Sequence, residues 1–127
     1  MSAGSKYFSV EEANAVIPQL LVDIPLLQTL MDDLTQKYPD VQMARKKFQF
    51  NGGSTQGADY INCVFKIKSL TEQLEAKGCI LKGVKHGLVD FLSLREGKEV
   101  YLCWKIPEQR IEYWHSIQEG FAGRQRI

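Results

Sequence analysis

The residue types best suited to chemistry gather near the C-terminus. Glu112 and His115 lie three positions apart, and Glu119 follows four positions after His115. On one helix these three side chains would share a face. Carboxylates and imidazole are common ligands of divalent metal ions, so a helical segment here predicts a metal site, to which Asp90 would add a fourth ligand. The alternative is a hydrogen-bonded His115 packed beside Trp114.

A second candidate is Asp90, which stands between Leu88 and Leu92 on one face of a predicted strand. Burying an unpaired carboxylate is costly, so this side chain needs a partner or solvent. A carboxylate paired with a histidine can also act as a general base on a bound substrate. The competing interpretations are a structural ion pair and a solvent-facing residue, and the candidate partners are a metal ion, Arg95, His115 and Arg124.

Signature motifs of enzymes are missing from the chain. The sequence has no phosphate-binding loop, no dinucleotide-binding glycine fingerprint, no nucleophile elbow and no zinc-protease pair of histidines. Cys63, Cys79 and Cys103 stand far apart without a CxxC pair, which favours reduced, buried and unreactive thiols over disulfides. A reactive Cys103 is the alternative. These motifs do not decide whether the chain is an enzyme.

The run of residues 45–50 interleaves three cations with two phenylalanines, a composition that can follow a phosphate backbone and stack on bases. The whole chain, however, has 16 Lys and Arg against 15 Asp and Glu, a formal net charge of +1. Such a charge produces no global field that attracts nucleic acid or an anionic membrane. We therefore expect neither as a partner.

The spacing of apolar residues along the chain predicts the helices and strands that position the candidate site residues. A capping box at residues 9–12 starts a helix, and apolar residues then recur every three or four positions. Pro18 and Pro25 each remove a helix hydrogen bond. We therefore predict a short helix at about 10–16 and a long helix at about 18–37, kinked at the two prolines.

A second long helix is predicted at about 58–77, where the apolar spacing resumes, and a short helix is one interpretation of residues 40–57. After Gly78 the period changes from three-and-four to two, which is typical of strands. The two helices are expected to pack on a small antiparallel meander, followed by an irregular C-terminal tail. This is an α+β architecture in one domain over residues 1–127, with three strands at about 79–82, 88–94 and 99–106.

The N-terminus lacks the apolar core of a signal peptide, and polar residues and a proline interrupt the most apolar stretch, residues 17–31. We therefore expect a cytoplasmic protein without a membrane span. The apolar stripes of the two helices exceed what a small three-stranded sheet can cover, which favours a homodimer. The alternative is that both helices complete the core of a monomer.

Five short sequence motifs are spread over most of the chain: Tyr7 to Asn14, Gly87 to Phe91, Glu99 to Trp104, Tyr113 to His115 and Gly120 to Gln125. They resemble an uncharacterised bacterial family, domain of unknown function 2203. The resemblance implies a bacterial cytoplasmic protein without an established activity. The family pattern omits Glu112 and falls on Asp90, Cys103, Trp104, Trp114, His115, Gly120, Phe121, Gly123 and Arg124.

This pattern directs attention to the point where the second strand meets the tail. We expect Asp90, His115 and Arg124 to converge there, with Gly120 and Gly123 letting the backbone fold close around them. The candidate pocket residues are Asp90, Cys103, Trp104, Trp114, His115 and Arg124.

We predict a small cytoplasmic binding or protein-interaction module that self-associates. The alternative is a metal-dependent enzyme or metal-binding protein in which Asp90, His115 and Glu119 hold a divalent metal ion. Arg124 would then clamp an anion beside the metal.

Overall fold

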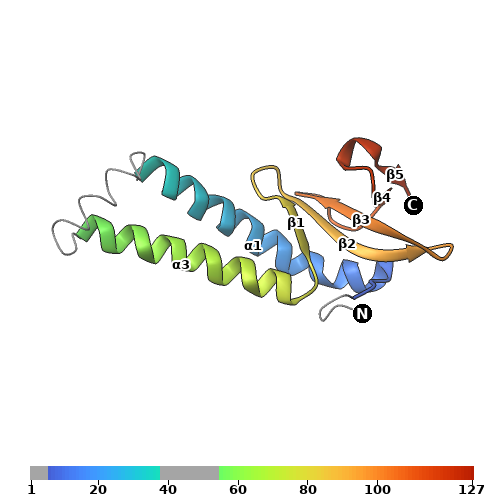
Figure 1. The fold of residues 1–127 in the computed structure, drawn as a ribbon, viewed down its shortest axis with the longest axis horizontal. Helices are drawn as coiled ribbons and strands as arrows, with labels where there is room; N and C mark the ends of the chain where they lie inside the picture. Colours follow the sequence, from blue (N-terminus) through green and yellow to red (C-terminus); the bar gives the residue numbers. More distant parts are fainter. Residues whose placement is uncertain (1–5, 38–54) are drawn as a thin grey trace.

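Two long helices and one antiparallel sheet make up the part of the chain that the computed structural model describes, residues 6–37 and 55–127. Helices α1 (Val10–Lys37) and α3 (Thr55–Ala76) lie side by side as a hairpin, and the sheet covers one end of it (Figure 1). The α+β class and the two long helices are therefore confirmed. The short helix considered for residues 40–57 falls mostly outside the described residues.

Helix α1 begins as predicted but is not divided. The Ser9 hydroxyl accepts a hydrogen bond from the Glu12 amide at 3.0 Å, and the Glu12 carboxylate accepts one from the Ser9 amide at 2.9 Å. The predicted division into two helices is wrong, since α1 continues through Pro18 and Pro25. Both prolines are exposed, so water can satisfy the carbonyls that they leave unpaired. A kink at the prolines stays a prediction.

The sheet contains five strands where three were expected. Strands β1 to β3 match the predicted meander, whereas β4, β5 and a short 3-10 helix, η1 (Phe121–Gly123), occupy the tail that was predicted to be irregular. In the β2–β3 turn, Glu96 and Gly97 both have positive φ, 53° and 79°, as tight type I′ hairpins require. The spatial order follows the chain: β1 (Ile80–Gly83), β2 (Leu88–Arg95), β3 (Lys98–Lys105), β4 (Tyr113–Ser116) and β5 (Gln125–Arg126).

The sheet packs one face on the helices. Val89 and Phe91 of β2 and Leu102 and Trp104 of β3 are buried in one core with the apolar stripe of α1. Phe8, just before α1, is buried there too, with its ring 5.0 Å from that of Phe91. The opposite face, called the outer face below, points away from both helices.

Helix α1 also meets the length and composition criteria for crossing a membrane, with a mean hydropathy of 1.2 over an 18-residue window. Core helices of soluble proteins meet the same criteria, and the residues of α1 from Ala13 to Leu27 include six that are buried. The prediction of no membrane span therefore stays a prediction.

Candidate functional site

A buried polar cluster lies on the outer face of the sheet. The strand register places Asp90 opposite Cys103 and Tyr101 opposite His115. Because side chains alternate along a strand, Asp90, Cys103 and His115 project from the same face of three neighbouring strands. Each of the three is only 2% exposed. The structure thus brings together two residues that the sequence predicted to converge, Asp90 and His115, and adds Cys103 between them.

The His115 imidazole and the Asp90 carboxyl group are hydrogen-bonded to each other. His115 Nε2 lies 3.0 Å from Asp90 Oδ2, and His115 Nδ1 lies 2.8 Å from the Ser116 carbonyl oxygen. A carbonyl oxygen only accepts hydrogen bonds, so Nδ1 carries a hydrogen. A second proton must then lie between Nε2 and the carboxyl group, on one partner or the other. The pair is neutral overall in both cases, which suits its burial.

Burial also controls the protonation of the groups around this pair. It raises the pKa of Asp90, although the neighbouring His115 acts in the opposite direction. Burial and the charge of Asp90 raise the pKa of Cys103 to about 12, and burial raises the pKa of Cys79 to about 11. Since the thiolate is the reactive form of cysteine, these two buried thiols are poor nucleophiles. The geometry therefore disfavours a reactive Cys103.

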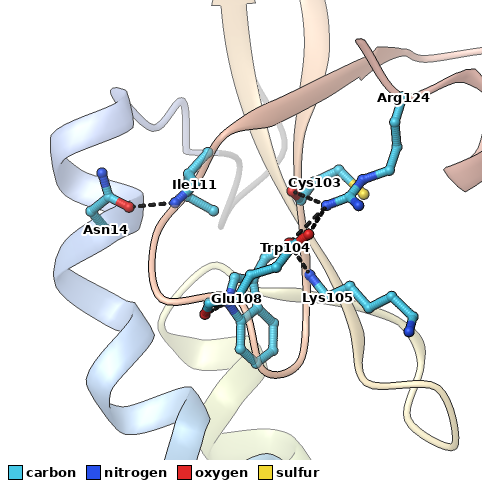
Figure 2. Close-up of polar contacts among 7 residues, drawn as sticks. All are labelled: Asn14, Cys103, Trp104, Lys105, Glu108, Ile111 and Arg124. Atoms are coloured by element: carbon cyan, nitrogen blue, oxygen red, sulfur yellow. Dashed lines mark hydrogen bonds and ion pairs between the residues drawn. The ribbon is translucent and has the colours of Figure 1, made fainter. Parts of the chain in front are cut away.

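Arg124 lies beside the cluster but is bound by other groups (Figure 2). Its Nη2 donates to the two carboxylate oxygens of Glu108 at 2.7 and 2.9 Å, and to the Cys103 carbonyl oxygen at 3.2 Å. The guanidinium carbon also stacks 4.0 Å from the ring centroid of Tyr113 and 4.6 Å from that of Phe121. Its charge is already paired, which argues against a role as an anion clamp.

The loop between β3 and β4 holds Glu108 in place, and sequence reasoning missed this residue. The Glu108 carboxylate accepts the Lys105 amide at 2.7 Å, while its carbonyl oxygen accepts the Trp104 indole N–H at 2.7 Å (Figure 2). Further along the loop, the Ile111 amide donates to Asn14 Oδ1 of α1 at 2.6 Å. Nothing in the spacing of Glu108 signals these contacts, because they join groups in an irregular loop.

Two aromatic residues of the predicted pocket lie on the other side of the sheet. Trp114 pairs with Leu102 in the register, so Trp114 and Trp104 project toward the helix side and not toward Asp90. Trp114 instead stacks under Arg95, at 4.7 Å from the guanidinium carbon to the ring centroid, and both residues line a pocket of 860 Å³. The predicted pocket residues therefore divide between two faces, and Arg95 is not the partner of Asp90.

Tyr101 and Lys82 flank the cluster on the outer face. The Lys82 amine lies 4.7 Å from the Tyr101 ring centroid, and that ring lies 5.5 Å from the His115 ring. Sequence reasoning did not select Tyr101, although it precedes Cys103 by two positions and strand alternation places both on one face.

The Glu-x-x-His interpretation is wrong, because residues 113–116 form strand β4 and not a helix. Glu112 instead pairs with Arg126 at 3.1 Å and with Arg110 at 3.6 Å. Glu119 is exposed, and its side chain lies against Gly123. Among the described residues, the group with metal-ligand character comprises Asp90, Cys103 and His115, whose ligand atoms all lie within 4.8 Å of one another.

Comparison with known proteins identifies a family but no activity. A family model described as an uncharacterized conserved protein (DUF2203) matches residues 6–127, so the chain belongs to this family. No curated protein and no solved structure matches the chain. The family resemblance seen in the sequence is confirmed, whereas a bacterial origin stays a prediction.

Proposed function

We propose that this member of an uncharacterised conserved family is a small interaction module that self-associates through its helical hairpin. The observation that carries the proposal is the exposure of large apolar side chains on both helices: Val22 and Phe65 are each 62% exposed and Leu26 is 48% exposed. The sheet covers only one end of the hairpin (Figure 1). Exposed apolar side chains on a helix pair favour packing against another helical surface.

The hairpin is long enough for a stable interface with a second copy of the chain. Helix α3 has 22 residues and is about 33 Å long at a rise of 1.5 Å per residue. Two hairpins packed along that length would bury on the order of 1,200–2,000 Å², the range of stable interfaces, in a symmetric dimer. One flank of the hairpin also holds a groove of 320 Å³, lined by Leu26, Leu30, Lys66, Ser69, Leu70 and Gln73.

The outer-face cluster supports catalysis less well than the hairpin supports association. A substrate would need access to Asp90 and His115, which are each 2% exposed, and Arg124 is paired with Glu108. The metal-dependent enzyme therefore remains the alternative. Three free cysteines suit a reducing compartment, so we propose a cytoplasmic location.

Light scattering across a concentration series tests the proposal. We expect the wild-type chain to have a dimeric mass, and Leu26→Glu and Phe65→Glu each to weaken the dimer by about tenfold or more, because a charge would enter an apolar contact. Leu94→Glu is the matched control, since Leu94 is 51% exposed but lies on β2. A wild-type monomer at every concentration, or equal weakening by the control, would contradict association through the hairpin.

A further inference from the structure

The outer-face cluster brings together one oxygen, one nitrogen and one sulfur donor. Asp90 makes side-chain hydrogen bonds to both His115 and Cys103, and the ligand atoms of all three residues lie within 4.8 Å of one another. Oxygen, nitrogen and sulfur donors together are the ligand types that zinc-class ions bind. Since the residues sit on three hydrogen-bonded strands, the sheet itself fixes their separation.

The orientation of His115 suits a metal ligand. The Nδ1–H group donates to the Ser116 carbonyl oxygen at 2.8 Å, which directs Nε2 toward Asp90. Histidines that bind metals through one nitrogen usually donate the other N–H to a carbonyl or carboxylate group, and that contact fixes the tautomer. The outer contact that a metal-binding histidine needs is therefore already present in the backbone of β4.

A divalent ion can replace the protons of the cluster without leaving a net charge. The metal-free cluster holds one proton between Asp90 and His115 and one on the Cys103 thiol. When the ion binds the carboxylate, the thiolate and the neutral imidazole, both protons leave to solvent. Two negative ligands then offset the two positive charges of the ion, and a neutral assembly is the least costly one to bury.

Two cations lie near these donors, and both also contact groups outside the cluster. Arg124 is hydrogen-bonded to Glu108, and the Lys82 amine lies over the Tyr101 ring. Arg124 also makes a side-chain hydrogen bond to Cys103, and the charge of Lys82 acts through space on Asp90. The three donor atoms nevertheless all lie within 4.8 Å of one another, so one ion can contact all of them.

We propose that Asp90, Cys103 and His115 bind one divalent metal ion of the zinc class, which cross-links strands β2, β3 and β4. Three protein ligands leave the fourth position of a tetrahedral ion to a water molecule enclosed with it. The burial of the ligands makes the ion part of the folded structure, so it enters during folding. The site does not depend on the proposed self-association.

Metal analysis of the full chain purified without an affinity tag tests the proposal, followed by refolding with Co²⁺ after chelator treatment. Refolding is needed because the donor atoms are buried. A thiolate bound to cobalt gives a charge-transfer band in the near ultraviolet, and this band reports the ligand set without any activity. We expect one metal ion per chain and a cobalt band that Zn²⁺ abolishes.

Substitution of single residues shows which side chains bind the metal ion. Cys103→Ser should remove the charge-transfer band, and His115→Gln should weaken Zn²⁺ binding by at least about tenfold. Cys63→Ser and His86→Gln are matched controls, because Cys63 is half-buried on α3 and His86 is exposed beyond β1, both outside the cluster. Both controls should bind cobalt as the wild-type chain does.

Three outcomes would overturn the site: folded wild-type chain that binds no Co²⁺, bound cobalt without the thiolate band, or loss of the band in Cys63→Ser to the same extent as in Cys103→Ser. Circular dichroism establishes that each protein is folded. The first two outcomes are measured on the unmodified chain, so the test holds even if a variant fails to fold.

Discussion

The two faces of the sheet bury their side chains by different means. The helix-facing side buries Val89, Phe91 and Trp104 in an apolar core, where area and close packing supply the stability. The outer face buries Asp90 and His115 although they are polar, and there each polar atom needs a partner. We therefore expect the helix-facing side to be sensitive to lost volume and the outer face to be sensitive to lost hydrogen bonds.

The largest effect is expected on the helix-facing side. Phe91→Ala should lower the free energy of unfolding by about 3–5 kcal/mol, because it leaves a cavity in a packed core. Phe91 is 0% exposed and its ring contacts that of Phe8. Urea denaturation measures the loss, with Leu94→Ala on the outer face of the same strand as the control. Equal losses in the two variants would contradict the contrast between the faces.

Two substitutions of Asp90 test whether hydrogen bonding stabilises the outer face. In chelator-treated protein, Asp90→Leu should lower the free energy of unfolding by about 1–3 kcal/mol, because His115 Nε2 loses its buried partner. Asp90→Asn should cost less, since its amide N–H can donate to the Nε2 of a histidine whose Nδ1 holds the hydrogen. Chemical denaturation compares the two variants. If the Leu variant proves as stable as the Asn variant, hydrogen bonding does not govern this face.

At Arg124 we expect a smaller loss, about 1 kcal/mol for Arg124→Lys. Lysine keeps the charge, but it loses the planar stacking on Tyr113 and the shared contacts to Glu108. Thermal denaturation measures this change, and Arg126→Lys is the control because Arg126 is 69% exposed at its side chain. A control that loses as much stability would indicate that the Arg124 contacts add nothing.

The smallest effect concerns Glu12, an exposed carboxylate that contrasts with Asp90. The hydrogen bond from the Ser9 amide lowers the pKa of Glu12 below its ordinary value of 4.5. The carboxylate therefore stabilises the fold above that ordinary value, and this contribution is lost as the pH falls through the lowered pKa. Melting temperatures of wild type and Glu12→Gln should differ slightly at neutral pH and converge in strong acid. If the difference between the two melting temperatures grows as the pH falls, the Glu12 carboxylate does not stabilise the fold in the way proposed.

Local signals in the sequence predicted the elements that do not depend on distant partners. The capping box at residues 9–12 and the end of α3 before Gly78 are both encoded within a few residues. Strand β4 was missed because its four residues show no clear alternation and its pairing with β3 depends on the tail folding back. The division of α1 was wrong because both prolines fall on its exposed side, where burial of the opposite stripe outweighs them.

Only part of the candidate site could be predicted from the sequence. A buried carboxylate at Asp90 required a partner, and His115 was among those named, but spacing could not choose it over Arg95 or Arg124. That choice depends on the register between β3 and β4, which forms over a loop of irregular structure. Glu108, the partner of Arg124, lies in that loop and carries no periodic signal.

The hydrogen bond between Asn14 and the Ile111 amide joins the helical layer to the sheet, so one amide hydrogen reports on both layers. This amide is bound to α1, and its loop is tied through Glu108 to Arg124 on the outer face. Exchange of the Ile111 amide hydrogen with solvent requires the loop to separate from the helix, a local opening with its own free energy. A faster exchange rate in Arg124→Lys than in Arg126→Lys would show that loosening of the tail reaches the helical layer through this one backbone position.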